Sequence, residues 1–312
     1  MSHLTWVEAA VVGAVQGVSE LFPVSSLGHS VLLPAVIGGS WARELDVAAP
    51  ESPYLAFIVG THVATALALL VFYRRDWVRL IGALFTSVRH RHVTGPDERL
   101  IWQLIVATIP VGLVGLVFEH WLRTHLGRPV PAACFLAANG VVLLWIEHRS
   151  GRSLPERPES DPHSDPAADV ETDPVAADPV AADRRLSRLT IPTVLAIGGS
   201  QILALAPGIS RSGIATATGM RAGLAREDAV RFSFLLATPV ILAAGVLKLP
   251  DLFGPLGNGI RPQVVFGSAL AGIGAYISVR WLTRWVHTNS LRPFGVYCLV
   301  AGIACLVWFS VR

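Results

Sequence analysis

Long apolar runs alternate with short polar segments along most of the 312-residue chain. A helix that crosses the hydrocarbon core of a bilayer needs about 20 mostly apolar residues. Six runs are long enough or nearly so, and we expect each of them to form a transmembrane helix. They cover residues 55–73, 100–118, 130–146, 230–248, 264–283 and 293–310.

Two further apolar stretches, residues 5–38 and 190–226, are interrupted by proline and serine. Pro23 and Pro207 end a helix, because proline lacks an N–H and clashes with the preceding turn. Each stretch then becomes two short helices, and neither helix is long enough to cross a bilayer. We expect two re-entrant hairpins, whose irregular backbone is tolerated only where protein buries it or it lines a cavity.

The expected order is a hairpin and three spans, then a linker, then a second hairpin and three spans. Because three is an odd number, the second hairpin enters from the opposite side of the membrane. The predicted fold class is an all-α integral membrane protein with an inverted-topology repeat, in which broken helices meet near mid-membrane. We divide one membrane domain into a first repeat (1–147), a linker (148–190) and a second repeat (191–312).

The linker is rich in proline and acidic residues, and it contains the near-repeat D-P-V-A-A-D-P-V-A-A-D. It shows no apolar periodicity. We therefore expect a disordered acidic tether.

Basic residues predict the orientation, because cytoplasmic loops of membrane proteins carry an excess of lysine and arginine. Most arginines lie in the loop at 74–99, at the two flanks of the linker and in the loop before the last span. All of these segments fall on one side in the scheme above. We take that side as cytoplasmic, so that the termini and the mouth of the first hairpin face outward.

Composition agrees with a polytopic membrane protein: 52% of the residues are hydrophobic and 15% are charged, against about 25% charged in a soluble domain. The net charge of +3 says little, because the charges are segregated, and we expect no nucleic-acid partner. Cys134, Cys298 and Cys305 lie in apolar runs and are expected to be small buried side chains, without a disulfide framework. No lysine or arginine precedes the first apolar stretch, so we expect no cleavable signal peptide.

The first broken stretch places polar groups inside apolar sequence: residues 13–29 read G-A-V-Q-G-V-S-E-L-F-P-V-S-S-L-G-H. Gln16 and Glu20 lie four residues apart on one helical face. Gly13 and Gly17 share a neighbouring strip, where another backbone could approach closely. Ionisable groups at membrane depth are costly and usually face a bundle interior or a cavity. We therefore expect Glu20 to be functional, although an interfacial carboxylate at a helix end is the alternative.

Two serines and a histidine follow the proline break. Ser25 and Ser26 could simply cap the next helix. His29 alone would more often be a hydrogen-bonded structural histidine. Its position one turn after Ser26 and near Glu20 favours a catalytic role.

The second broken stretch repeats this order, since residues 198–213 read G-G-S-Q-I-L-A-L-A-P-G-I-S-R-S-G. Pro207 corresponds to Pro23 at an offset of 184 residues. Arg211 stands in the second copy where the first has an acid. A guanidinium beside the N–H groups of a helix N-terminus makes an anion site, above all for phosphate, although a snorkelling arginine is the alternative. We expect the two stretches to meet and form one site.

Other polar residues are weaker candidates. The first span carries Thr61, His62 and Thr65, which could pack against the first hairpin. Arg221 and Arg231 could bind an anionic head group or mark the cytoplasmic edge of a helix. Two acids near helix ends, Glu8 and Glu147, are expected to be solvated.

The two motifs resemble those of a known family, the BacA-type undecaprenyl-diphosphate phosphatases. The matching segments are Q-G-V-S-E-L-F-P-V-S-S-L-G-H at 16–29 and P-G-I-S-R-S-G at 207–213. Shorter similarities occur at 107–110, 221–223, 231–236 and 292–297. The resemblance therefore covers nearly the whole chain apart from the linker.

The resemblance implies an enzyme of the bacterial plasma membrane that hydrolyses undecaprenyl diphosphate and recycles the lipid carrier for cell-wall synthesis. It also implies a divalent cation, Mg²⁺ or Ca²⁺, with Glu20 as the metal residue. Among the matching positions, Ser26 corresponds to the proposed nucleophile, His29 to the acid/base and Arg211 to the phosphate-binding arginine. The expected substrate-binding residues are Gln16, Ser25, Gly208, Ser210, Ser212 and Gly213.

Three positions depart from the family pattern. Gln16 replaces the more frequent glutamate, Leu27 stands where threonine is usual, and Cys298 where arginine is usual. Serine attack and direct water attack both stay open, as does the oligomeric state, for which a homodimer is one option. The expected partners are the polyprenyl diphosphate and membrane lipids. A polyprenyl-phosphate transporter on the same scaffold is the rival function.

Overall fold

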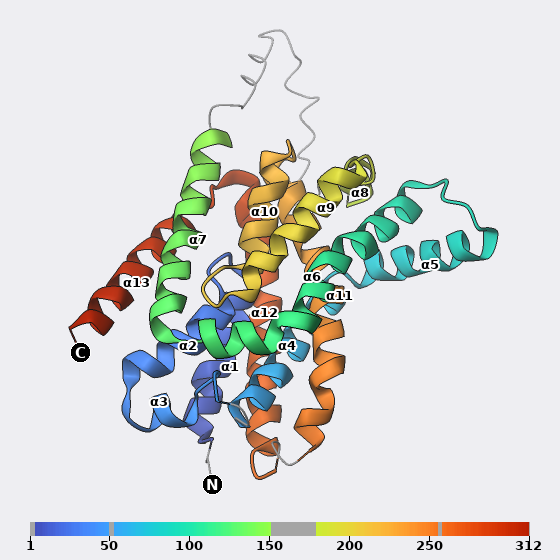
Figure 1. Ribbon diagram of the computed structural model, residues 1–312. Helices are drawn as coiled ribbons and strands as arrows, with labels where there is room; N and C mark the ends of the chain where they lie inside the picture. Colours follow the sequence, from blue (N-terminus) through green and yellow to red (C-terminus); the bar gives the residue numbers. More distant parts are fainter. Residues whose placement is uncertain (1–3, 50–52, 151–178, 255–257, 312) are drawn as a thin grey trace, which may run out of the picture.

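The computed structural model describes residues 4–49, 53–150, 179–254 and 258–311, and these residues form helices without any strand (Figure 1). Six described helices are long and apolar enough to cross a membrane, which confirms the six predicted spans. They are α4 (Pro53–Phe72), α6 (Pro96–Leu126), α7 (Pro129–Ser150), α11 (Arg226–Phe253), α12 (Arg261–Thr288) and α13 (Arg292–Ser310). The shorter elements are α1 (Trp6–Leu21), α2 (Ser26–Ile37), α3 (Gly39–Glu44), α5 (Arg74–His90), α8 (Pro179–Leu186), α9 (Ile191–Ser200), η1 (Gln201–Leu205) and α10 (Arg211–Arg221).

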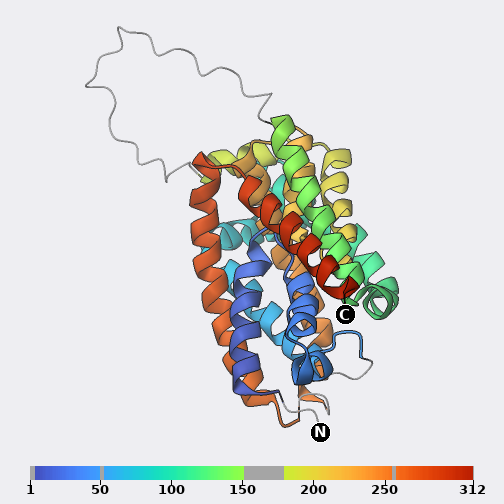
Figure 2. The same cartoon turned by 90° about the vertical axis from the view of Figure 1, so that its left-hand side faces the viewer.

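The two halves of the chain are interleaved. In the most extensive helix pairs, α13 packs on α7, and α12 packs on both α1 and α4 (Figure 2). Glycine allows the α1–α12 approach, because a Cβ on Gly13 would lie 2.4 Å from the carbonyl oxygen of Gly267. A Cβ on Gly17 would lie equally close, 2.4 Å, to the carbonyl oxygen of Ala271. The close backbone approach predicted for this glycine strip is confirmed.

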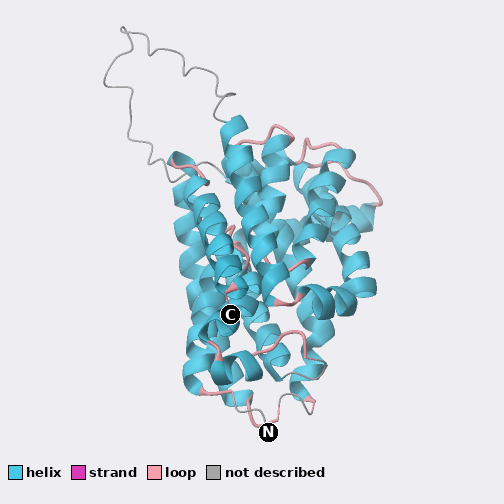
Figure 3. Ribbon diagram, turned by 60° about the vertical axis from the view of Figure 1, so that its left-hand side comes forward, coloured by secondary structure: helices cyan, strands magenta, loops and turns pink. Residues whose placement is uncertain are grey.

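Both broken stretches form two short helices around an irregular segment. The breaks lie inside the helical body, where Figure 3 shows loop segments between helices. Side chains cap the N-termini of three of these helices. The Thr5 hydroxyl accepts a hydrogen bond from Glu8 N at the start of α1, and Ser25 and Ser210 cap α2 and α10 in the same way. Glu8 completes a capping box and is only 2% exposed, so the expectation of a solvated Glu8 is wrong.

Two segments that the sequence indicated as irregular contain helices. The arginine-rich loop expected at 74–99 begins with α5, which buries Trp77 and Leu80 on one face. The last part of the expected linker contains α8. The first three residues of that linker, 148–150, belong to the end of α7. Residues 151–178, which hold most of the predicted acidic tether, lie outside the described residues.

A buried aspartate explains why α8 is folded. Asp183 has no exposed surface, and its carboxylate pairs with Arg79 of α5 and with Arg231 of α11, the latter at 2.9 Å. Arg231 also donates to Asp76 at 3.0 Å. Charged groups are buried only when they are paired and hydrogen-bonded, so this network holds α8 against both halves of the chain. The sequence interpretation of Arg231, as a head-group ligand or a residue at a helix edge, did not include these ion pairs.

Glu147 is also buried, at 2% exposure, and the prediction of a solvated carboxylate is wrong. Arg226 donates to both of its oxygens, at 2.8 and 2.9 Å, and Leu291 N donates at 2.9 Å. The carboxylate thus joins α7 to the starts of α11 and α13.

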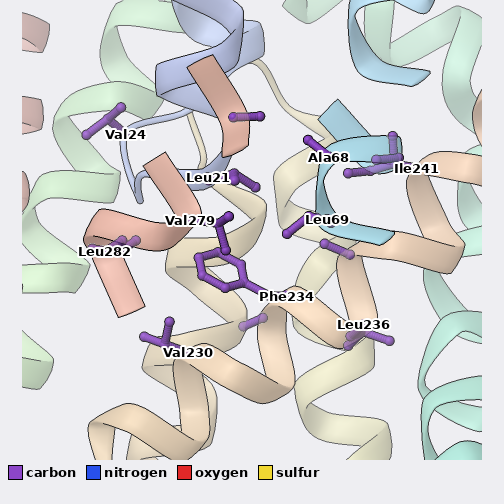
Figure 4. Packing of buried hydrophobic residues seen from close by; sticks show 14 of the residues in the cluster. Leu21, Val24, Ala68, Leu69, Val230, Phe234, Leu236, Ile241, Val279 and Leu282 are labelled. Atoms are coloured by element: carbon purple, nitrogen blue, oxygen red, sulfur yellow. The ribbon is translucent and has the colours of Figure 1, made fainter. Parts of the chain in front are cut away.

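Apolar side chains from both halves fill the space between the long helices. Figure 4 shows Phe234 of α11 among Leu21 at the end of α1, Leu69 of α4 and Val279 of α12. All three cysteines are free thiols; Cys298 is buried as expected, but Cys134 is exposed.

Candidate active site

The two proline breaks meet, as predicted. The Ser25 hydroxyl oxygen accepts hydrogen bonds from Gly28 N, in its own helix, and from Gly208 N, 3.1 Å away in the second break. The Ser212 hydroxyl donates to the carbonyl oxygen of Leu21 at 3.2 Å. These two hydrogen bonds therefore join residues that are separated by 183 and by 191 positions in the sequence.

Asn139, in the middle of α7, bridges the same two breaks. Its Nδ2 donates to the carbonyl oxygen of Pro23 at 2.9 Å, and its Oδ1 accepts from Ser210 N at 3.0 Å. Nδ2 also lies 3.4 Å from the sulfur of Cys298. The amide is 2% exposed and satisfies backbone groups that no helix can pair, since both breaks leave such groups free.

The backbone at the junction is tightly constrained. Ser25 has a φ of 68°, in the left-handed region that side chains rarely adopt, and Gly208 has a φ of 112°. A Cβ on Gly28 would lie 2.9 Å from the Cα of Gly208. Strained non-glycine residues persist only where surrounding bonds hold them, and they concentrate at functional sites. The two hydrogen bonds to Ser25 Oγ supply that restraint here.

Glu20 is the centre of the polar cluster. Its Oε2 accepts hydrogen bonds from the hydroxyl of Ser26 and from Gln16 Nε2, the latter at 2.9 Å. His62 Nε2 lies 3.3 Å from the same oxygen. Arg211 lies 3.6 Å from the other oxygen, Oε1. The carboxylate is 4% exposed, so these four side chains replace most of its water.

Two helix N-termini adjoin this cluster. Helix α2 begins at Ser26, and α10 begins at Arg211. Ser25 and Ser210 satisfy the third N–H of each helix, those of Gly28 and Gly213. In the described part of the chain, no protein acceptor is bonded to the first two N–H groups of either helix. Unpaired N–H groups and the helix dipole favour an anion at such a place.

His29 is placed differently from the other predicted catalytic residues. Its Nδ1 lies 2.7 Å from the carbonyl oxygen of Ser25, and its Nε2 lies 2.7 Å from the hydroxyl of Tyr297. The two rings stack, with an interplanar angle of 6°. His29 therefore makes no described hydrogen bond to Ser26 or Glu20, although it lies one helical turn from the serine.

The predicted substrate-binding residues fall into two groups. Gln16 contacts Glu20 directly, whereas the hydroxyls of Ser25 and Ser212 bond across the two breaks. The Ser210 hydroxyl bonds within its own break, to Ser212 Oγ and Gly213 N. Gly208 and Gly213 contribute N–H groups to the same bonds.

Sequence reasoning gave His62 only a packing contact and did not single out Asn139. A signal was present for both, because a histidine and an asparagine inside apolar spans need polar partners.

The donor set around Glu20 fits a divalent cation that is shared with an anionic ligand. Gln16 Oε1 is buried and accepts no hydrogen bond from any described residue, which leaves a neutral oxygen ligand beside the carboxylate. The described residues contain no group of three or more His, Cys, Asp or Glu side chains that could hold a metal ion. Mg²⁺ is commonly held by one or two carboxylates together with substrate phosphates, so one acid suffices for that mode.

Comparisons with known proteins agree along the whole chain. Residues 9–304 match the family model described as "Bacitracin resistance protein BacA". The chain is 57% identical to a Mycolicibacterium paratuberculosis protein named undecaprenyl-diphosphatase, over 100% of this chain and 99% of that protein. It is 50% identical to undecaprenyl-diphosphatase 1 of Frankia casuarinae, over 100% of both chains. A Burkholderia lata protein named undecaprenyl-diphosphatase 2 is 40% identical over 96% of this chain and 95% of its own length.

Proposed function

Because the chain belongs to the BacA family of multi-span bacterial membrane proteins, we propose that it is an undecaprenyl-diphosphatase. The substrate is undecaprenyl diphosphate, and the products are undecaprenyl phosphate and inorganic phosphate. This hydrolysis returns the carrier lipid to cell-wall polysaccharide synthesis. Full-length relatives at 50 and 57% identity carry this activity in their names.

One observation carries the proposal at the level of chemistry. A buried carboxylate, a serine hydroxyl and an arginine from two distant segments converge at two helix N-termini. Phosphoryl transfer needs positioning and charge neutralisation more than covalent chemistry by the protein. Arg211 and the free N–H groups of α2 and α10 supply positive charge for a diphosphate, and Ser26 with Glu20 supplies a hydroxyl beside a base.

We assign the nucleophile to Ser26. Its oxygen attacks the terminal phosphorus, a new P–O bond forms, and the bond from that phosphorus to the bridging oxygen breaks. Undecaprenyl phosphate leaves with the bridging oxygen, and the serine proton passes to Glu20 Oε2, which already accepts the Ser26 hydrogen bond. Water then hydrolyses the phosphoserine, which restores Ser26 and releases inorganic phosphate.

His62 acts as a positioning residue for Glu20. Its Nδ1 lies 2.9 Å from the carbonyl oxygen of Ile58, and its Nε2 faces the carboxylate. The histidine thus fixes the direction of Glu20 from a neighbouring span. His29 keeps the acid/base role that the resemblance implies only if its ring leaves Tyr297, since both ring nitrogens are engaged.

Glu20 Oε1 and Gln16 Oε1 are the oxygens that would hold a divalent cation, Mg²⁺ or Ca²⁺, together with the diphosphate. When bound, the cation neutralises phosphate charge as it builds up in the transition state. Arg211 turns from Glu20 toward the phosphates, because its present contact at 3.6 Å is long for a hydrogen bond.

We further propose the membrane placement expected from the sequence. The helix pairs α1–α2 and α9–α10 are re-entrant, the two repeats have inverted topology, and the arginine-rich face is cytoplasmic. The support is the helix–break–helix form of both stretches and their meeting inside the bundle. The Glu20 site then opens to the outer side of the plasma membrane.

The decisive experiment is phosphate release by the purified protein in detergent from a polyprenyl diphosphate. We expect turnover, and Glu20→Gln should lower it by about a hundredfold or more, the scale of one lost electrostatic group. Glu44→Gln, in α3 outside the cluster, is the matched control and should keep the wild-type rate. A transporter on this scaffold would release no phosphate in detergent, and that result would overturn the proposal.

A second measurement separates serine attack from water attack. With substrate labelled in its terminal phosphate, acid quenching during turnover should trap label on wild-type protein and none on Ser26→Ala. Turnover without any trapped label would assign the attack to water.

A further inference from the structure

A cavity lies away from Glu20, at the arginine-rich end of the molecule. Its volume is about 720 Å³. Its walls come from the junction of α4 and α5, from α8, from the start of α11 and from the second half of α12. None of the residues predicted for catalysis lines it.

The cavity carries an excess of positive charge. Three carboxylates line it, and each has a basic partner: Asp76 pairs with Arg231, Asp228 with Arg185 and Glu227 with His287. Four further arginines line it: Arg74, Arg75, Arg280 and Arg284. In the described part of the chain, none of these four is paired with a carboxylate. The excess positive charge therefore favours the binding of an anion in this cavity.

The remaining lining is apolar and aromatic. Phe72, Val230, Tyr276 and Val286 face the same space as the four arginines. A small inorganic anion would gain nothing from contact with these apolar side chains. An amphiphile does, because its charged head can meet the arginines while its chains lie along the apolar side chains.

Helix α5 sets the level of Arg74 and Arg75 in the membrane. It leaves the end of α4 sideways, across the direction of the long helices (Figure 1). Val78, Ile81, Phe85 and Val88 form an exposed apolar stripe along it, with exposures of 75, 44, 69 and 58%. An amphipathic helix of this kind lies in the membrane interface. Arg74 and Arg75, at its first turn, are then at the depth of lipid head groups.

An apolar layer separates this cavity from the Glu20 site. Val230 lines the cavity, and it also borders a void of about 10 Å³ that touches Leu21 and Ser212. Phe234 and Leu282, which Figure 4 shows, also line that void, together with Pro23, Thr216 and Leu291. The cavity is therefore a separate site and not the inner end of the catalytic one.

We propose that this cavity binds the phosphate head group of an anionic membrane lipid from the leaflet on the linker side. Guanidinium groups bind phosphate oxygens in pairs of parallel hydrogen bonds. Basic pockets between transmembrane helices on the cytoplasmic side are suited to such head groups. The four arginines, which have no carboxylate partner among the described residues, hold the phosphate, and the apolar lining holds the start of the lipid chains.

The test measures lipid binding to the purified full-length protein by native mass spectrometry in detergent. Wild type should bind phosphatidylglycerol in preference to phosphatidylcholine with the same chains. Arg280→Gln/Arg284→Gln should weaken phosphatidylglycerol binding roughly tenfold or more. Arg89→Gln/Arg91→Gln removes two exposed arginines of the same face outside the cavity, and it should keep the preference.

A second double variant, Arg74→Gln/Arg75→Gln, should lose the preference as well, and it tests the other wall if the first variant fails to fold. Phosphate release should be unchanged in both cavity variants, because they leave the Glu20 cluster intact. Equal loss in the Arg89/Arg91 control would mean non-specific surface charge and would overturn the site. Binding of inorganic phosphate as tightly as phosphatidylglycerol would also overturn it, because the ligand would then be a free anion.

Discussion

At the scale of single residues, the two oxygens of Glu20 have different surroundings. Oε2 is shared by Ser26, Gln16 and His62, whereas among the described residues Oε1 has only the long contact with Arg211. The first oxygen is therefore held in place and the second is available for charge that enters with the substrate. Preorganised groups of this kind cost no reorganisation at the moment of reaction.

His62 should act through its hydrogen bond to Glu20. We expect His62→Leu to lower kcat by about tenfold to a hundredfold with little change in KM, because the carboxylate loses its fixed direction. His62→Gln restores an N–H donor at a similar reach and should recover most of the rate. Steady-state kinetics of both variants provide the measurement. If glutamine and leucine are equally poor, His62 does more than position the acid.

Gln16 leads to a prediction about metal binding. The empty wild-type site offers one carboxylate and one neutral oxygen, so we expect weak Mg²⁺ binding unless the diphosphate is present. Gln16→Glu places a second carboxylate beside Glu20, and Mg²⁺ affinity of the empty protein should rise about tenfold or more, since the two acids repel without a cation.

The measurement for Gln16 is a Mg²⁺ titration of wild type and variant, each with and without a non-hydrolysable diphosphate lipid. Gln16→Leu removes the oxygen and is the control for a change in packing. Tight Mg²⁺ binding by the lipid-free wild type would require another carboxylate, and the single-acid site would be wrong.

Residue chemistry was predictable from the sequence where it depended on local order. Glu20, Ser26 and Arg211 are marked by polar groups beside a proline in apolar sequence, and the structure brings all three together. His62 and Asn139 reach the site only through the packing of α4 and α7, which local order does not specify. Likewise, nothing local shows that His29 pairs with Tyr297, 268 residues away.

At the scale of elements, the short helices carry the site and the long ones fix their positions. Spans were predictable because about 20 apolar residues have few alternatives in a membrane. Helix α8 was not, because its first five residues, P-V-A-A-D at 179–183, repeat the P-V-A-A-D at 174–178 of the segment before it. Its folding depends on Asp183 meeting Arg79 and Arg231, two partners from distant segments.

The two parts of the predicted linker should respond differently to change. Asp183→Ala removes the buried carboxylate that pairs with Arg231. We expect the free energy of unfolding to fall by about 3 kcal/mol, since breaking a buried ion pair is costly. Deletion of residues 158–176 removes no described contact and should leave both stability and phosphate release unchanged. Thermal unfolding in detergent measures the first effect, and Asp173→Asn is its control. An inactive but folded deletion variant would give the segment a role beyond tethering.

At the scale of the whole molecule, each half supplies only part of the bundle. Helix α12 of the second half lies against α1 and α4 of the first, and α13 lies against α7. The composition and order of spans predicted this all-helical membrane architecture, but they could not predict which helices pair. Close pairing depends on shape, such as Gly13 against Gly267.

The proposed orientation can be tested on intact cells. In a background without the three native cysteines, a cysteine introduced at Ser40 of α3 should react with an impermeant thiol reagent added outside. A cysteine at Ser164, in the linker, should react only after the membrane is opened. If both react from outside, the linker is not cytoplasmic and the inverted-topology proposal is wrong.

Asp183 also has a consequence for how the protein is made. Its partner Arg79 is synthesised long before it, whereas Arg231 leaves the ribosome 48 residues later. The nascent chain therefore cannot complete this network until the start of α11 has emerged. A longer delay applies to Glu20 and Arg211, so a half-made chain in the membrane has Glu20 and Ser26 but not the arginine proposed to bind phosphate. Hydrolysis of carrier lipid begins only once synthesis has passed into the second half.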